Sequence, residues 1–385
     1  MYKRDFSAAE FATRQARVRA AMAARKLDLL VVIHPANINW LIGARHKSYQ
    51  QFQCLFIGAD ASDGLVMLTR LAEQWELQAE SLASEVRGWG GREPENPIDA
   101  FAAIVREKSW QGRRIGLEVP RYYIGVEEHG AIRAFLGSAI KADATRLVEE
   151  LKFVKSPAEL RYIGKAVGFA DAAMAAFVKA AKPGRTEHQL AGEVYRTMLS
   201  AGGDVPASPI NIGFGPRSAY GHPLPSERKL RRGDFGQVEY GAAFRRYCTT
   251  LGRQVVVGKP NRKQSDLYKV VRESCDAAIA AIRPGVRADV PHEAAKRVIV
   301  KAGLEHGRWH LTGYGIAPGF APVWGESLEM DGGSRDVIAA GMVLSIEPPV
   351  FLPKEKLGCR IIDNVLVTAK GCRVLSTYTR DLIVL

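Results

Sequence analysis

The sequence predicts a protein of two domains that both mix helices and strands: an α/β domain over residues 1–152 and a larger α+β domain over residues 153–385. The chain has 385 residues, and compact domains usually contain about 100 to 200. Helix and strand signals alternate in the first domain, which is typical of an α/β fold. The second domain contains an internal repeat, which predicts approximate two-fold symmetry.

Elements of the first domain follow from local patterns. Residues 7–10, Ser-Ala-Ala-Glu, have the pattern of a capping box and predict a helix that continues to about Lys26. The apolar run over residues 27–33 predicts a buried strand. Residues 54–57 and 65–68 predict two paired strands across a turn-rich segment, and residues 114–119 predict a further strand.

The second domain begins with a strong helix start. Residues 156–159 place Ser at the cap, Pro at the first helical position and Glu at the third, so a helix is predicted to about Ala181. A Pro-Gly pair ends this helix at residues 183–184, and another occurs 101 positions later at residues 284–285. Ala-Gly pairs at residues 201–202 and 302–303 have the same offset. The spacing predicts two similar helical units, each followed by strands, although Pro-Gly loops can also coincide by accident.

Strands of the second domain are predicted over residues 237–240, 250–257, 342–347, 359–367 and 373–376. Glu239 and Glu347 lie on apolar strands, where a charged side chain is costly unless it is paired or binds a ligand. These two carboxylates are therefore the first candidates for function. A cleft between symmetric halves is the natural place for such a site.

Composition excludes several classes of protein. The net charge is +13, but the basic residues are scattered and no nucleic-acid-binding motif accompanies them. No apolar run approaches the roughly 18 residues of a membrane span, and the N-terminus has no apolar signal core. The five cysteines are widely spaced without a CxxC pair, which favours reduced thiols. We expect a cytoplasmic enzyme with no nucleic-acid or membrane partner.

Several segments together resemble the creatinase/prolidase/methionine aminopeptidase superfamily. They are residues 313–316 (Gly-Tyr-Gly-Ile), 345–348 (Ser-Ile-Glu-Pro) and 360–363 (Arg-Ile-Ile-Asp), with His222 before the first of the acidic strands. The resemblance covers essentially the whole chain. It implies a pita-bread C-terminal domain with pseudo-two-fold symmetry, preceded by a creatinase-type N-terminal domain.

The resemblance also implies where metal ligands would lie. Metal-dependent members hold two ions with five ligands, and these fall on Glu239, Thr250, Tyr314, Glu347 and Ile362. Only the two glutamates are good ligands, whereas each transition-metal ion needs about four donors. Asp363 should point to the opposite face of its strand. We therefore expect no metal and no cofactor, with a single hard cation between the glutamates as the remaining alternative.

Two branches of the superfamily, creatinase and ectoine hydrolase, work without metal. Residues 238–242 and 319–326 resemble segments of ectoine hydrolase. The function implied is hydrolysis of a C–N bond in a small cationic or zwitterionic substrate, such as a cyclic amidine or guanidino compound. His222 would act as general acid and base. Glu239 and Glu347 would bind the cationic group, or Glu239 would attack it directly.

Five further residues are candidates for substrate binding. Tyr314, Phe320 and Trp324 would supply aromatic walls for a cation, and Thr250 lies between the acidic strands. Arg45 belongs to an N-domain loop that, in relatives, comes from the neighbouring subunit, so the resemblance implies a homodimer with this loop near the partner's site. Two alternatives remain: a metal-dependent Xaa-Pro dipeptidase, and an inactive binding protein with the same fold.

Overall fold

The computed structural model describes residues 5–91, 93 and 95–385. The chain divides into two compact units, residues 1–152 and 153–385. Each unit has its own sheet and its own hydrophobic core, and each is described here by itself.

The N-terminal unit contains a six-stranded sheet of order β4-β3-β2-β1-β5-β6. Its strands are β1 (Leu29–Val32), β2 (Cys54–Gly58), β3 (Leu65–Arg70), β4 (Glu85–Trp89), β5 (Ile115–Leu117) and β6 (Ile140–Asp143). Its helices are α1 (Ala8–Ala24), α2 (Pro35–Ile42), α3 (Gln74–Glu80), α4 (Pro97–Glu107), α5 (Val126–Leu136) and α6 (Leu147–Phe153). Strand β1 pairs antiparallel with β2 and parallel with β5, so the sheet is mixed.

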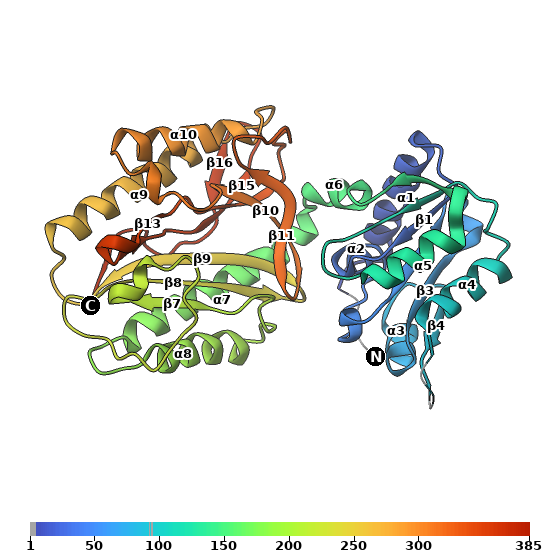
Figure 1. The fold of residues 1–385 in the computed structure, drawn as a ribbon, viewed down its shortest axis with the longest axis horizontal. Helices are drawn as coiled ribbons and strands as arrows, with labels where there is room; N and C mark the ends of the chain where they lie inside the picture. The colour runs from blue at the N-terminus through green and yellow to red at the C-terminus, as the bar shows by residue number, and fades with distance from the viewer. Residues whose placement is uncertain (1–4, 92, 94) are drawn as a thin grey trace. The chain divides into compact units, whose positions relative to one another are not determined.

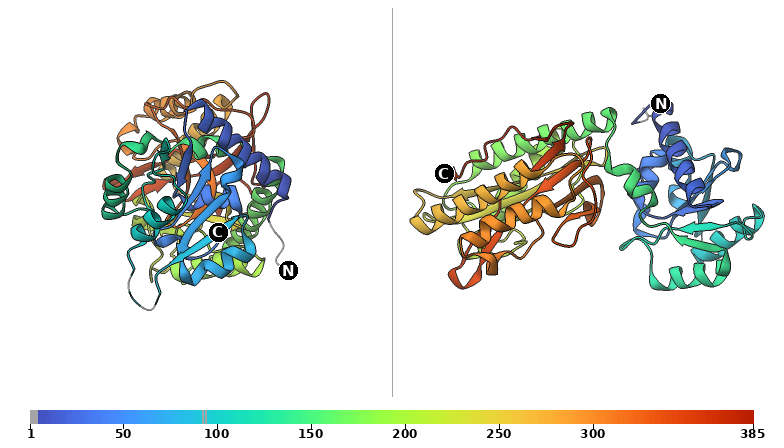
Figure 2. Two further views of the ribbon diagram at one scale, coloured as in Figure 1. Left: turned by 90° about the vertical axis from the view of Figure 1, so that its right-hand side faces the viewer. Right: turned by 90° about the horizontal axis from the view of Figure 1, so that it is seen from above.

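Local sequence explains how this unit begins. The Ser7 side chain accepts a hydrogen bond from the backbone N–H of Glu10, as the capping pattern predicts. Val18 and Met22 of α1 pack against Leu30 and Val32 of the fully buried strand β1. Figure 2 shows α1 on one face of the sheet, and α4 and α5 on the other.

The C-terminal unit is built on a strongly curved sheet of order β16-β15-β12-β10-β9-β8-β7, with β11 paired to β10 and β17 paired to β9. The strands are β7 (Asn211–Phe214), β8 (Phe235–Phe244), β9 (Tyr247–Val256), β10 (Gly313–Phe320), β11 (Val323–Met330), β12 (Val343–Ile346), β13 (Val350–Leu352), β14 (Leu357–Cys359), β15 (Asp363–Val367), β16 (Cys372–Val374) and β17 (Ile383–Val384). Strands β13 and β14 form a separate two-stranded hairpin.

Two helix pairs cover this sheet at the positions that the repeat predicts. The first pair is α7 (Pro157–Ala180) with α8 (Glu187–Ser200), and the second is α9 (Arg262–Ala281) with α10 (Asp289–Lys301). In Figure 1, α9 and α10 lie above the strands and α7 and α8 lie below them. Gly184 and Gly285 adopt φ values of +90° and +87° in the equivalent loops, a conformation that favours glycine.

The structure corrects two predictions about strands. The segment over residues 359–367 is not one strand: β14 ends at Cys359, and β15 begins at Asp363. Strands β10 and β11, which form a hairpin next to β12, were not predicted from the sequence. Both corrections affect the site, because Tyr314 and Trp324 lie on the missed strands and Arg360 lies in the gap.

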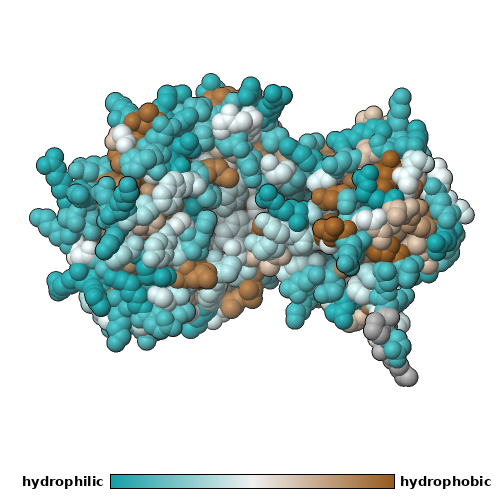
Figure 3. Space-filling model, viewed as in Figure 1, coloured by the Kyte–Doolittle hydropathy of each residue, from teal (hydrophilic) through white to brown (hydrophobic). Residues whose placement is uncertain are grey.

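The surface of the C-terminal unit is mostly hydrophilic, and the cysteines are not paired in disulfides. On the face viewed in Figure 3, hydrophilic residues cover most of the C-terminal unit, and hydrophobic residues occur in small separate patches. All five cysteines are free thiols. Within the described ranges, no helix is long and apolar enough to span a membrane.

Candidate active site

A buried ion pair joins strand β8 to the segment between β14 and β15. Glu239 is on β8 and is 4% exposed, and Arg360 is 1% exposed in the gap between β14 and β15. Nη1 of Arg360 donates a hydrogen bond to Oε2 of Glu239. Arg360 was not predicted from the sequence as a site residue. It could have been, because side chains two positions apart on an extended segment share a face. Arg360 is two positions before Ile362, the expected position of the fifth metal ligand.

Glu347 follows the last residue of β12 and is buried. Its Oε2 accepts hydrogen bonds from the Ser345 hydroxyl at 3.1 Å and from the Tyr314 hydroxyl at 3.4 Å. Burial raises the pKa of Glu347 to about 8, although the nearby Arg360 opposes this shift. Burial therefore favours the protonated, neutral form of this carboxyl group.

His310 lies beside this carboxyl group, and His222 lies beside His310. The ring centroids of His222 and His310 are 5.7 Å apart, and Nδ1 of His310 lies 3.5 Å from Oε1 of Glu347. Burial, followed by the charge of Arg360, lowers the pKa of His222 and lowers that of His310 to about 4. Both imidazoles are neutral at pH 7, so the His310–Glu347 contact joins two uncharged groups. No distinct pattern in the sequence pointed to His310.

Tyr314 and Trp324 form one wall of this cluster. Nε1 of Trp324 on β11 donates a hydrogen bond of 2.9 Å to the Tyr314 hydroxyl on β10. Burial raises the pKa of Tyr314 well above its usual range, so the phenol stays neutral. Of the aromatic residues proposed from the sequence to bind substrate, Tyr314 thus contacts Glu347, and Trp324 is joined to Glu347 through Tyr314.

Thr250 belongs to a neutral hydrogen-bond network that extends to Glu347. The Asn364 side chain donates to Thr250 Oγ1 at 2.7 Å, and Thr250 Oγ1 lies 3.2 Å from the Ser345 hydroxyl. Ser345 in turn donates to Glu347. Thr250 therefore orients the site through its neighbours.

The fifth expected metal-ligand position is occupied by Ile362, whose side chain is a hydrocarbon and cannot bind a metal ion. Ile362 is fully buried and forms a bridge to Gly252 on β9. A Cβ placed on Gly252 would lie 2.6 Å from Cγ1 of Ile362, so the isoleucine occupies space that only glycine leaves open. Asp363 points away, as predicted, and pairs with Arg253 at 2.9 Å and Arg380 at 2.6 Å.

The structure does not bring Phe320 to the two carboxylates. Phe320 lies six residues beyond Tyr314 on β10, about 20 Å at the usual strand rise, and its ring packs 4.4 Å from the Arg246 guanidinium. Arg45 is in the N-terminal unit, where its Nε lies 3.0 Å from Asp5 Oδ2.

The residues at this site do not fit a dinuclear metal centre. Three of the five expected positions hold Thr250, Tyr314 and Ile362, and a fourth, Glu239, is hydrogen-bonded to Arg360. Within residues 5–91, 93 and 95–385, no three His, Cys, Asp or Glu side chains are grouped so that they could hold a metal ion. The charge balance also differs from the expected negative pocket, because Arg360 compensates Glu239 and Glu347 is protonated.

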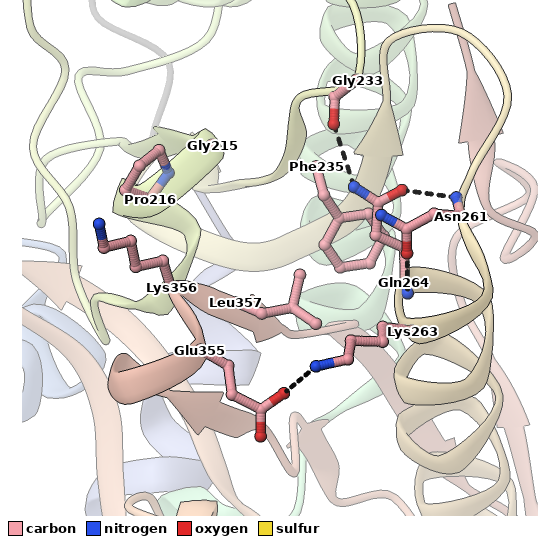
Figure 4. Close-up of a pocket in the computed structure, with 10 residues that line it drawn as sticks. All are labelled: Gly215, Pro216, Gly233, Phe235, Asn261, Lys263, Gln264, Glu355, Lys356 and Leu357. Atoms are coloured by element: carbon pink, nitrogen blue, oxygen red, sulfur yellow. Dashed lines mark hydrogen bonds and ion pairs between the residues drawn. The ribbon is translucent and has the colours of Figure 1, made fainter.

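A separate pocket of about 270 Å³ lies elsewhere in this unit. Figure 4 shows its lining from the start of β8, the N-terminus of α9 and the turn before β14, with the Gln264 amide bonded to Gly233 and Lys263 paired with Glu355. None of the sequence candidates lines this pocket. The candidate active site is the cluster around Glu239, Arg360 and Glu347, which are buried, together with the partly exposed His310 and the exposed His222.

This fold and site agree with the family matches. Residues 161–369 match metallopeptidase family M24, and residues 14–154 match the creatinase/prolidase N-terminal domain. The chain belongs to metallopeptidase family M24, and it is a hydrolase of that family. The predicted architecture, a pita-bread domain behind a smaller α/β domain, is confirmed.

Particular relatives fall into two groups. The chain is 31% identical to the Xaa-Pro dipeptidase of Pyrococcus horikoshii, over 94% of this chain and 96% of the relative. It is 25% identical to the ectoine hydrolase of Halomonas elongata, over 98% of each chain. The solved structure of dipeptidase PepE from Mycobacterium ulcerans aligns with a TM-score of 0.85 and 27% identity, over 98% of this chain and 99% of that one.

Proposed function

We propose that this protein hydrolyses a C–N bond in a small substrate of the amidine or guanidine type, with acid–base side chains in place of metal ions. One observation carries the proposal. The site combines a neutral base, His222, with a protonated acid, Glu347, while the positions of the family's metal ligands are occupied by a threonine, a tyrosine and an isoleucine. The similarity to ectoine hydrolase supports the substrate class.

The reaction needs one proton acceptor and one proton donor. A ring nitrogen of His222 takes a proton from water, whose oxygen forms a bond to the electrophilic carbon. The carbon–nitrogen bond then breaks, and the leaving nitrogen takes the proton of Glu347. His310, which lies between the two, can return the proton from His222 to Glu347. The net change is the addition of one water molecule.

Glu239 binds the substrate in this proposal. Its Oε2 accepts a hydrogen bond from Arg360, which reduces the nucleophilicity of the carboxylate. We therefore favour water as the nucleophile over direct attack by Glu239. Glu239 would accept hydrogen bonds from the substrate nitrogens, and Tyr314 and Trp324 would pack against the planar group.

The test measures hydrolysis of ectoine and creatine by His222→Ala and Glu347→Gln proteins. We expect each variant to lose activity by about 100-fold or more, the usual contribution of a general acid or base, with the melting temperature close to wild type. His188→Ala, at a histidine whose side chain is 57% exposed, should retain full activity. Full activity in His222→Ala would remove this residue from the mechanism.

A second candidate, an Xaa-Pro dipeptidase, is favoured by the higher identity to the Pyrococcus horikoshii enzyme. Metal analysis of protein purified without chelator separates the two. Two equivalents of Mn, Co or Zn, with cleavage of Gly-Pro that EDTA abolishes, would support the dipeptidase. Hydrolysis of an amidine or guanidine that is insensitive to EDTA would support the first proposal.

A further inference from the structure

Arg360 uses only part of its hydrogen-bonding capacity. Nη1 donates to Glu239, but Nε and Nη2 are buried and have no hydrogen-bond partner among the residues that the structure describes. Buried donors are nearly always paired in folded proteins, and those of a charged group most of all. Two adjacent unpaired N–H groups inside a candidate active site therefore call for a ligand.

Arg253 provides an internal comparison. It is equally buried, one residue after Gly252, yet all three of its nitrogens have partners. Its Nε donates to a backbone carbonyl at 2.6 Å, its Nη1 donates to two at 2.8 Å, and its Nη2 donates to Asp363 at 2.9 Å. The fold thus satisfies one buried guanidinium completely and leaves an edge of the other open beside Glu239.

The open edge has a defined chemistry. The N–H groups on Nε and Nη2 of a guanidinium are parallel and match the two oxygens of a carboxylate. A single carbonyl oxygen or alkoxide would satisfy this pair less well, because it presents one oxygen to two parallel donors. A carboxylate on the substrate is the ligand that fits both donors.

We propose that Arg360 binds the carboxylate of the substrate, and that the substrate is a compact zwitterion whose carboxylate lies close to the C–N group bound by Glu239. The inference rests on the proposed function for the nature of the C–N group. It assigns Arg360 as the specificity-determining residue within the C-terminal unit.

Charge balance favours a zwitterion over a simple cation or anion. Arg360 and Glu239 form a buried ion pair and compensate each other's charge. A ligand with one charge would bring an uncompensated charge beside this buried pair, which is costly. A compact zwitterion can place its carboxylate against Arg360 and its cationic group against Glu239, so that neither charge is left uncompensated.

The test compares acids with their carboxamides. Binding of ectoine, creatine and Gly-Pro, each against its amide, is measured by calorimetry on the wild type, Arg360→Gln and Arg360→Lys, with Arg253→Lys as the matched buried-arginine control. In at least one pair the wild type should prefer the acid by about 10- to 100-fold. Arg360→Gln should reduce this preference to within about 3-fold, and Arg360→Lys should retain part of it. Arg253→Lys should lower the melting temperature and keep the preference.

Each result is decisive. Equal binding of acid and amide, no binding in any pair, or an acid preference that survives in Arg360→Gln would overturn the inference. If Arg360→Gln instead lowers kcat equally for an acid and its amide, the guanidinium stabilises the reacting centre, and the inference is again wrong. An acid preference that depends on Arg360 without any turnover would uphold the inference and reject the proposed function. Turnover without a preference for the acid would reject the inference and uphold the proposed function.

Discussion

The carboxyl group of Glu347 determines how the site responds to pH. Burial raises its pKa from the ordinary 4.5 to about 8, so between these pH values the folded protein holds a proton that the unfolded chain has released. Stability then decreases as pH rises through this window. Burial lowers the pKa of His310 from 6.5 to about 4, and this has the opposite sign, with stability increasing between pH 4 and 6.5.

A stability prediction follows for the range in which Glu347 loses its proton while His310 stays neutral. Between pH 6.5 and 8, the free energy of unfolding of the wild type should fall by about 2 kcal/mol relative to Glu347→Gln, at roughly 1.4 kcal/mol per pH unit. Chemical denaturation of both proteins at several pH values measures this difference. Parallel pH profiles for the two proteins would show that Glu347 is already ionised at pH 7, and the assignment of Glu347 as the acid would fail.

Among the secondary-structure elements, those with strong local signals were predictable and those defined by their neighbours were not. Ser156 and Glu159 form the capping box that the sequence predicts at the start of α7. Strand β10 was missed because glycines and a proline made residues 313–319 resemble a loop. It is a strand because β11 and β12 pair with it on either side, and such tertiary context outweighs intrinsic propensity.

The same distinction applies to the site. Glu239 and Glu347 were found because a charged residue on an apolar strand is unusual in any context. Arg360 was missed for two reasons. Its partner Glu239 lies 121 positions away in the chain, and the single strand predicted over residues 359–367 left no place for the irregular segment that contains Arg360. The resemblance indicated which of the expected ligand positions hold other residues, whereas only the fold shows what those residues contact.

The packing of Ile362 on Gly252 of strand β9 can be tested by substitution. Gly252→Ala would place a Cβ within 2.6 to 2.9 Å of three carbon atoms of Ile362, and overpacking of this kind costs about 1–3 kcal/mol. We expect a corresponding loss in the free energy of unfolding, measured by denaturant titration. The matched control is Gly192→Ala in α8, where nothing lies within 4 Å of the added carbon and alanine should stabilise the helix. Equal effects at both glycines would contradict the packing described here.

At the scale of the whole molecule, we propose that the protein is a homodimer in which the Arg45 loop of one subunit completes the site of the other. Arg45 pairs with Asp5 in its own N-terminal unit, so the proposal rests on the family resemblance. It predicts complementation between variants. A mixture of inactive His222→Ala and inactive Arg45→Ala proteins, unfolded and refolded together, should regain part of the wild-type activity, because one site in each mixed dimer has both residues.

Activity assays on the mixture and on each variant refolded alone check this prediction, and light scattering gives the mass of the assembly. A monomer in solution, or full activity of Arg45→Ala by itself, would show that Arg45 has no role across subunits. The cytoplasmic location expected from the sequence stays a prediction.

The close packing of Ile362 on Gly252 also has an evolutionary consequence. A mutation that restored glutamate at residue 362 would put an acid into a space shaped for a branched hydrocarbon, with Thr250 and Tyr314 unable to help it capture an ion. Because residues 250, 314 and 362 all lack a good metal ligand, no single substitution would give this chain the five-ligand set of the metal-dependent relatives.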